Sequence, residues 1–193
     1  MKLLHIDSSI LGQNSASRAL SAAVVATRQA AEPDLQVTYR DLAATPLPHL
    51  SGGSLAGADA AEAAAASEVL QEFLDADVVV VGAPMYNFGI PSTLKAWIDR
   101  LAVAGKTFRY NEQGMAEGLA AGKQVVIASC RGGFHQDDGA DFQEPYLRYM
   151  FGFMGITDVG FVRAEGLAVS PEQRETSMRQ ALQSIDAQLA EAA

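Results

Sequence analysis

The sequence predicts an α/β fold in which helices cover both faces of a doubly wound, five-stranded parallel sheet. Short apolar segments typical of strands alternate five times with amphipathic helical segments along the 193 residues. One of them, Val78–Val81, is an unbroken valine run, as expected for a strand buried on both faces. No repeat or low-complexity linker divides the chain, so we expect one domain over residues 1–193.

Local composition predicts the elements of the amino-terminal half. Leu3–Ile6 reads as a strand, and helical spacing of Ala, Leu and Val predicts a helix over Ser17–Ala30. The shorter and more polar Leu35–Tyr39 suits an edge strand. Gly and Ser over Ser51–Asp59 predict a mobile loop, and strong helix formers predict a helix over Ala60–Leu74.

The carboxyl-terminal half continues the alternation of strands and helices. Ser92 is expected to cap a helix after Pro91, and Ser170-Pro171-Glu172-Gln173 matches a capping box with proline at the first helical position. The remaining expected elements are a helix over Ser92–Leu101, a small hairpin at Phe108–Gly114, a strand over Gln124–Ala128, a helix over Pro145–Met154, a strand over Val159–Ala164 and a final helix to Ala190.

Charge and composition exclude several classes of function. The formal net charge is −9, and the Lys and Arg residues are scattered, which disfavours nucleic acid and anionic lipid as partners. No apolar run is long enough to span a membrane and no signal peptide is recognisable, so we expect a cytoplasmic protein. Cys130 is the single cysteine and the histidines lie far apart in sequence, so we expect no disulfide and no metal site.

The predicted topology places three loops together. With strand order 2-1-3-4-5, the loops after the first, third and fourth strands are neighbours at one edge of the sheet, where open α/β sheets bind ligands. These loops span residues 7–17, 84–91 and 129–141. We therefore expect the chemistry of this protein at that edge.

The first loop carries several hydroxyl groups just before a helix. Ser8, Ser9, Ser15 and Ser17, together with the free amides of the helix start, suit a phosphate dianion without any lysine. The alternative is that these serines serve only as turn and cap residues. Neither a GxGxxG fingerprint nor a Walker motif is present, so a dinucleotide-binding fold or a P-loop NTPase is not supported.

The second and third loops suit a planar ligand. Met85, Tyr86 and Phe88 would form an apolar wall held by flanking prolines, although packing beneath the loop is the commoner fate of such residues. Gly132 and Gly133 permit close approach of the backbone, although they also suit an ordinary turn. Together the three loops favour flavin mononucleotide (FMN) over a nucleoside triphosphate or a sugar, on a flavodoxin-like fold.

Several motifs resemble the FMN-dependent NADH:azoreductase and quinone reductase family over nearly the whole chain. They are Ser8-Ser9-Ile10-Leu11, Ser15-Ala16-Ser17, Ala83-Pro84-Met85-Tyr86-Asn87-Phe88, Thr107-Phe108-Arg109-Tyr110, Arg131-Gly132-Gly133 and Gly155-Ile156-Thr157-Asp158. The resemblance implies a homodimer with active sites at the subunit interface. The FMN contacts that we expect are Ser9, Ser15, Ala16, Ser17, Pro84, Met85, Tyr86, Asn87, Phe88, Ser129, Cys130, Arg131, Gly132 and Gly133.

One residue departs from the family pattern. Family members typically carry serine where this chain has Cys130, and a thiol is a weaker hydrogen-bonding group than a hydroxyl. The polar contact to FMN at this position is therefore expected to be softer. A nucleophilic role for Cys130 is not supported, because no C-x5-R phosphatase loop follows it.

The resemblance implies ping-pong hydride transfer from NADH or NADPH through FMN to quinones or aromatic azo compounds, with no protein nucleophile. Arg131 and the glycine amides would stabilise negative charge on the flavin. Substrate contacts are expected from Phe108, Phe134, Phe151 and His135, whereas Phe153 suits the core. Two rival interpretations stay open: a single-electron carrier for protein partners, and a flavin-free interaction domain on the same scaffold.

Overall fold

The computed structural model describes residues 1–135 and 139–190 of the chain and contains the predicted parallel sheet. All neighbouring strands of the sheet run parallel, and their order is β2-β1-β3-β6-β7. Counted along the sheet's own strands, this is the predicted order 2-1-3-4-5. The strands are β1 (Lys2–Asp7), β2 (Gln36–Asp41), β3 (Val78–Pro84), β6 (Gln124–Cys130) and β7 (Asp158–Ala164).

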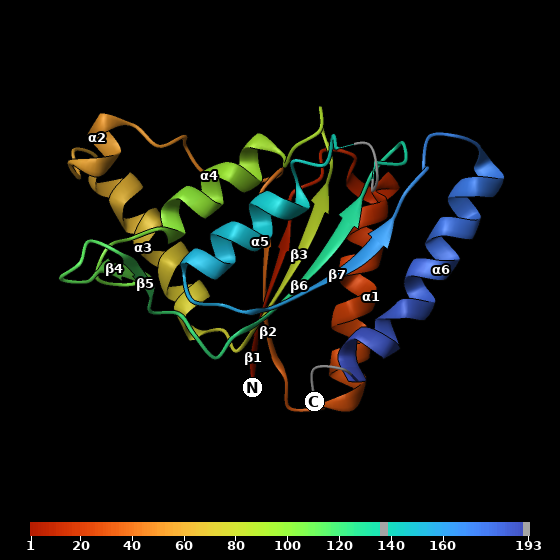
Figure 1. Cartoon of the computed structure of the whole chain (residues 1–193), viewed down its shortest axis with the longest axis horizontal. Coiled ribbons are helices and arrows are strands. Elements are labelled where there is room, and N and C mark those ends of the chain that lie inside the picture. Colours follow the sequence, from red (N-terminus) through yellow and green to blue (C-terminus); the bar gives the residue numbers. More distant parts are fainter. Residues whose placement is uncertain (136–138, 191–193) are drawn as a thin grey trace.

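Helices cover both faces of this sheet, as predicted (Figure 1). On one face lie α1 (Ala16–Ala31) and α6 (Pro171–Ala190), and on the other lie α3 (Ala60–Asp75), α4 (Ser92–Leu101) and α5 (Glu144–Phe153). The valines of β3 alternate between two separate hydrophobic cores, because successive side chains of a strand point to opposite faces. The continuous valine run therefore buries both faces of the central strand.

A two-stranded antiparallel hairpin lies beside the main sheet. Its strands are β4 (Phe108–Tyr110) and β5 (Ala116–Gly118), so the predicted range Phe108–Gly114 covers only the first strand and the turn. A Cβ at Gly118 would collide with the backbone of Gly155, so the hairpin packs directly on the turn after α5. This close approach requires glycine at both positions.

The expected mobile loop at Ser51–Asp59 contains a short helix, so that prediction was wrong in part. Helix α2 (Gly52–Leu55) begins with a capping box in which Ser51 and Ser54 bond each other's backbone amides. A serine pair at this spacing replaces the usual Ser–Glu signal. The sequence prediction missed it because the helix is only four residues long.

Two predicted helix caps differ in detail. Ser92 is the first residue of α4 rather than its cap, and Pro91 occupies the capping position without a side-chain hydrogen bond. Ser170 does cap α6, since its Oγ accepts a hydrogen bond from the amide of Gln173 at 3.1 Å. The Gln173 side chain, however, bonds Ser177 on the next turn, so only the serine half of the box forms.

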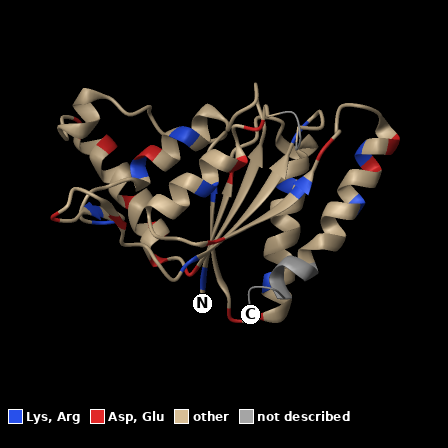
Figure 2. Ribbon diagram, viewed as in Figure 1, with Lys and Arg blue, Asp and Glu red and all other residues tan. Residues whose placement is uncertain are grey.

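The charged residues are interspersed over the surface. In Figure 2, Lys and Arg as well as Asp and Glu lie on both sides of the sheet, and neither sign gathers on one side. In the described ranges no helix combines the length and the apolarity needed to cross a membrane. Nor do three His, Cys, Asp or Glu residues of those ranges form a group that could hold a metal ion.

Candidate functional site

A cavity of about 180 Å³ lies at the carboxyl edge of the sheet, the upper edge in Figure 1. The three loops predicted to meet do meet there. The expected cofactor residues that line the cavity are Ser9, Ser15, Ala16, Ser17, Pro84, Met85, Tyr86, Cys130, Arg131 and Gly132. None of the described residues in its lining is acidic, although the chain carries a net charge of −9.

A fourth segment, not predicted from the sequence, completes the cavity. Leu167 and Ala168 follow β7, and Arg174 lies in the first turns of α6. The strand order contained a signal for this, because β7 neighbours β6 and ends at the same edge. The loop after the fifth strand was therefore as well placed as the other three.

Serine hydroxyls form one end of the cavity. Ser15 is the N-cap of α1, and its Oγ accepts a hydrogen bond from the amide of Arg18. The Oγ atoms of Ser15 and Ser17 lie 3.1 Å apart, and both residues are buried. Ser9 Oγ lies 3.2 Å from the hydroxyl of Tyr86, which joins the first loop to the second. Ser9, Ser15 and Ser17, here called the serine cluster, surround the positive end of the α1 dipole and suit a phosphate.

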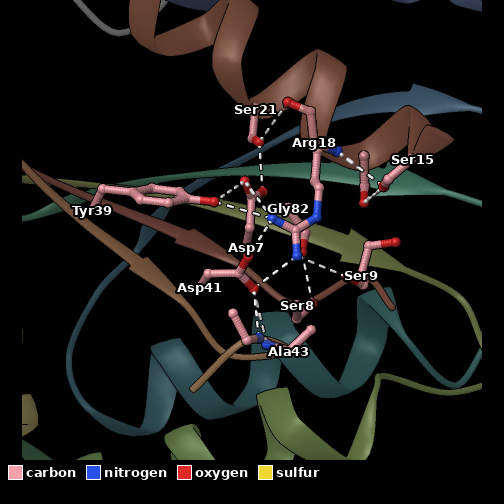
Figure 3. A network of polar contacts seen from close by, with 12 residues as sticks. Asp7, Ser8, Ser9, Ser15, Arg18, Ser21, Tyr39, Asp41, Ala43 and Gly82 are labelled. Atoms are coloured by element: carbon pink, nitrogen blue, oxygen red, sulfur yellow. Dashed lines mark hydrogen bonds and ion pairs between the residues drawn. The ribbon is translucent and has the colours of Figure 1, made fainter. Parts of the chain in front are cut away.

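Arg18 supports the serine cluster from behind (Figure 3). Its guanidinium makes two hydrogen bonds of 2.7 Å to the Asp41 carboxylate at the end of β2. The same group donates to the carbonyl oxygen of Ser9 at 2.8 Å. Hydrogen bonds from Arg18 hold the pKa of the Asp41 carboxyl below its ordinary value. The arginine charge is thus neutralised, and its role here is to fix the first loop to β2.

A buried carboxylate, Asp7, lies beneath this ion pair. It accepts hydrogen bonds from Ser21 Oγ at 2.8 Å and from the Tyr39 hydroxyl at 3.1 Å. Burial, and then the charge of Asp7, raise the pKa of Tyr39. His5 lies 2.9 Å from Ser21 Oγ and is buried in the same network, so its position is structural. A Cβ at Gly82 would collide with Asp7 Oδ1, so this glycine makes room for the carboxylate.

The loop after β3 makes a tight turn in an uncommon conformation. Two backbone hydrogen bonds close Tyr86 on Gly89, and between them Asn87 and Phe88 have φ angles of 48° and 68°. Positive φ at two successive residues is typical of a type I′ turn and is unusual for phenylalanine. Phe88 is about half exposed, and both central residues lie outside the cavity lining. The apolar side chains of this loop therefore lie in two places. Met85 and Tyr86 line the cavity, whereas Phe88 lies on the surface.

The glycine loop after β6 is held against the segment after β7. Gly132 and Gly133 accept hydrogen bonds from the amides of Ala168 and Gly166. No described residue accepts a hydrogen bond from the amides of Gly132 and Gly133 themselves. These two donors therefore have no partner among the described residues, and Gly132 lines the cavity whereas Gly133 lies outside the lining. Residues 136–138 of the expected loop lie outside the described residues.

The Arg131 side chain does not have the expected role of a free positive charge. Its guanidinium is almost fully buried and forms ion pairs with Asp141 at 3.0 Å, Glu144 at 2.7 Å and Glu165 at 3.5 Å. Arg163 shares Glu144 at 2.8 Å. Three carboxylates thus surround two arginines, so the cluster offers no net positive charge to a ligand. The prediction missed this because the carboxylates come from other segments: Asp141 and Glu144 lie before and at the start of α5, and Glu165 follows β7.

Cys130 and Ser129 occupy different environments. Cys130 is buried in the cavity lining, and burial raises the pKa of its thiol to about 12, so it is a neutral group. Ser129 is fully buried outside the lining and donates to the side-chain oxygen of Gln143. The Gln143 amide in turn donates to the carbonyl of Ala83, which joins β6, β3 and the start of α5. Ser129 thus supports the site without facing the cavity.

The four expected substrate contacts fall in three places. Phe151 is fully buried in the core, so its assignment to the substrate pocket is wrong. Phe108 lies on the hairpin, with its ring 4.6 Å from the ring of Phe153 and away from the cavity. Phe134 is 57 % exposed, and the His135 ring follows it in the glycine loop. Phe134 and His135 follow the lining residue Gly132 in the same loop, but neither of them lines the cavity itself.

His135 contacts the second loop directly. Its ring centroid lies 5.6 Å from that of Phe88 in an edge-to-face arrangement, and its amide donates to Glu165. The contact joins the turn after β3 to the loop after β6.

The arrangement fits FMN. Neutral hydroxyls and helix amides at one end suit the phosphate, and the Met85–Tyr86 wall and the two glycine amides suit a flat ring with polar edges. The absence of acidic side chains from the described lining removes the repulsion that a phosphate would otherwise meet. Neutral Cys130 accepts a planar group without adding charge.

Comparisons with known proteins agree with this fit. Residues 1–189 match the model of a family described as having the flavodoxin-like fold. The FMN-dependent NADH:quinone oxidoreductase of Stenotrophomonas maltophilia (strain K279a) is 63 % identical over 185 residues, covering 96 % of this chain and 94 % of that protein. That of Xanthomonas axonopodis pv. citri (strain 306), designated FMN-dependent NADH:quinone oxidoreductase 1, is 61 % identical over 182 residues, covering 94 % of each.

Solved azoreductase structures are also similar to this chain. An azoreductase from Bacillus anthracis str. Sterne has a TM-score of 0.85 at 30 % identity, covering 96 % of both chains. An FMN-dependent NADH-azoreductase from B. anthracis str. Ames Ancestor, solved in complex with FMN, has a TM-score of 0.84 at 26 % identity, covering 96 % of this chain and 97 % of that one. The chain described here belongs to the FMN-dependent NADH:quinone oxidoreductase and azoreductase family.

Proposed function

We propose that this chain is an FMN-dependent oxidoreductase that transfers two electrons from NADH or NADPH to quinones and aromatic azo compounds. The observation that carries the proposal is the cavity at the carboxyl edge of the sheet, where hydroxyls, an apolar wall and the unbonded Gly132 amide meet with no acidic side chain among the described lining residues. The reaction class is supported by the relatives, which are named FMN-dependent NADH:quinone oxidoreductase and FMN-dependent NADH-azoreductase.

The chain's own residues would hold FMN at two ends. The serine cluster and the amides at the start of α1 would bind the phosphate. Met85 and Tyr86 would lie against the ring, and the amides of Gly132 and Gly133 would donate to its polar edge. When bound, FMN supplies hydride acceptance from a nicotinamide and hydride donation to an acceptor.

The protein's contribution is position and electrostatics. Free amides of the glycine loop are preorganised donors for negative charge that develops at the ring edge, and they cost no reorganisation during the reaction. The buried Arg131 cluster holds that loop in place rather than contributing a net charge. The exposed rings of Phe88 and Phe134 would contact flat substrates of either kind at the rim.

Steady-state kinetics test this proposal. NADH and the acceptor would occupy the same rim in turn, so reciprocal plots against menadione at several NADH concentrations should be parallel. NADPH and an aromatic azo dye, tested in the same way, would rank the donors and acceptors. Intersecting plots would contradict the ping-pong order, and no NADH oxidation with any of these acceptors would contradict the enzyme assignment itself.

We also propose that the protein acts as a homodimer. Ile10, Leu11, Phe134 and Phe142 are all more than half exposed, and Leu11 lines the cavity itself. Large apolar side chains in such positions are typical of a surface that another chain covers. Sedimentation velocity at micromolar concentration should give the mass of two chains, and a mass of one chain would contradict the proposal.

A further inference from the structure

We propose that Arg174 on α6 supplies the positive charge that binds the FMN phosphate, and so makes this site prefer FMN to riboflavin. The inference rests on the proposed placement of FMN in the cavity. Arg174 lies in α6, outside the three loops predicted to bind the cofactor, and far from the serine cluster in sequence.

The position of Arg174 brings its guanidinium to the serine cluster. The residue lines the same cavity as Ser9, Ser15 and Ser17. Its Nη2 donates to the carbonyl oxygen of Asn14 at 3.3 Å, and Asn14 directly precedes the cap of α1. The guanidinium therefore lies beside the amides and hydroxyls that would receive the phosphate.

The other two arginines beside the cavity are already neutralised. Arg18 makes two 2.7 Å hydrogen bonds to Asp41, and the buried Arg131 is surrounded by three carboxylates. No described residue, by contrast, places a carboxylate within ion-pair distance of Arg174. Arg174 is thus the cation beside the serine cluster that keeps its charge for a ligand.

This charge matters because the rest of the site is neutral. Hydroxyls and amides bind a phosphate through neutral donors, whereas a guanidinium adds a charge-assisted hydrogen bond that is about twice as strong. The chain's net charge of −9 also opposes the approach of an anion, which makes a local cation valuable. Riboflavin lacks the phosphate, so it would gain nothing from Arg174.

Flavin titration of the apo-protein tests the inference directly. Arg174→Ala should weaken FMN binding about tenfold, the size expected for one charge-assisted hydrogen bond, and should leave riboflavin binding unchanged. Arg174→Lys should be intermediate, because it keeps the charge and loses the fork. Raising the salt concentration should also lower the FMN affinity of the wild type more steeply than that of Arg174→Ala.

Arg179→Ala is the matched control. Arg179 lies on the same helix, is exposed, and has its Nη1 4.0 Å from Glu175. Its substitution by alanine changes the net charge by the same amount as Arg174→Ala, but the residue does not line the cavity. It should leave FMN affinity near the wild-type value. Thermal unfolding of both apo-variants checks that each is folded.

Two results would overturn the inference while leaving FMN binding intact. In the first, Arg174→Ala weakens FMN and riboflavin equally or not at all. In the second, Arg179→Ala weakens FMN as much as Arg174→Ala does. Failure of the wild-type protein to bind FMN would instead overturn the proposed function and this inference together.

Discussion

Arg18 and Asp41 form a bidentate ion pair, with two hydrogen bonds of 2.7 Å, behind the loop that carries Ser9 of the serine cluster. The same guanidinium bonds the Ser9 carbonyl, so the end of β2 is tied to the loop after β1 (Figure 3). The pair is mostly buried, which keeps it from being screened by solvent as a surface ion pair is. Its geometry sets the position of the first cofactor loop.

Asp41→Asn is expected to weaken both the fold and FMN binding. The substitution leaves the partly buried guanidinium with only the Asp7 carboxylate, 3.7 Å from its Nη1, as a counter-charge, and should lower the free energy of unfolding by about 1 to 3 kcal/mol. Arg18, which donates to the Ser9 carbonyl, would no longer be fixed to β2 by Asp41, so FMN affinity should fall as well. Urea unfolding of the apo-protein and FMN titration measure the two effects separately.

Glu72→Gln provides the matched control for Asp41→Asn. Glu72 receives two hydrogen bonds of 2.9 Å from Arg40, whose side chain is as buried as that of Arg18. This ion pair joins β2 to α3 and does not line the cavity. Glu72→Gln should cost stability and spare FMN affinity. A loss of FMN affinity equal to that of Asp41→Asn would show that the effect is global.

Gly82→Ala is expected to destabilise the protein through Asp7. An added Cβ would meet Asp7 Oδ1 and lie 3.3 Å from the carbonyl of Ser17, at the base of the first loop. Overpacking of this kind should lower the free energy of unfolding by about 1 to 3 kcal/mol. The cost should shrink in an Asp7→Ala background, where the carboxylate is gone, and urea unfolding of the double-mutant cycle measures that coupling.

A glycine-to-alanine substitution at a position with free space around it shows whether the cost at Gly82 comes from the clash with Asp7 or from loss of any glycine. A Cβ at Gly52 meets nothing within 4 Å, so Gly52→Ala should leave the free energy of unfolding nearly unchanged. Equal costs for Gly82→Ala with and without Asp7 would contradict the steric explanation.

The topology could be predicted from the sequence because each strand and helix carries its own periodicity. Helical spacing also indicates that Phe151 is a core residue, and the prediction of substrate contacts did not use it. Leu147, Phe151 and Met154 are spaced four and three residues apart and form one buried stripe toward the core. The position of Phe151 in that stripe predicts a core residue rather than a substrate contact.

The electrostatics of the site could not be predicted in the same way. The charge of Arg131 is cancelled by carboxylates at positions 141, 144 and 165, and that of Arg18 by Asp41. Which carboxylate meets which arginine depends on how separate strands, helices and loops pack together. Arg174 and Asn14 are 160 residues apart, and only the packing of α6 beside α1 brings them together. Local pattern carries no information about such pairs.

The turn after β3 stores backbone strain at Phe88. Its φ of 68° favours glycine, so Phe88→Gly should be more stable than Phe88→Ala by about 1 kcal/mol in urea unfolding. Both variants lose the aromatic ring and its contact with His135, so quinone reduction should fall equally in the two. Equal stability would show that the turn has relaxed from this conformation.

The raised pKa of Cys130 predicts how stability responds to alkaline pH. Burial raises the pKa of this thiol to about 12 in the folded chain, whereas in the unfolded chain it ionises near its ordinary value of about 9. Between these two values the unfolded state has released the proton and the folded state still holds it. The free energy of unfolding should therefore fall with rising pH, by up to about 1.4 kcal/mol per pH unit from this group.

Cys130→Ser tests the origin of that slope, since serine does not titrate in this range. Tyr146 has a pKa that is also raised to about 12 by burial, so Tyr146→Phe removes a second contribution of the same sign. In urea unfolding between pH 8 and 11, each variant should flatten the decline by its own share. Native Cys130 should also resist iodoacetamide at pH 8, because only the thiolate reacts and this one is neutral and buried. Rapid alkylation of the native protein would show that the thiol is exposed and ionised, and would remove the basis for the predicted slope.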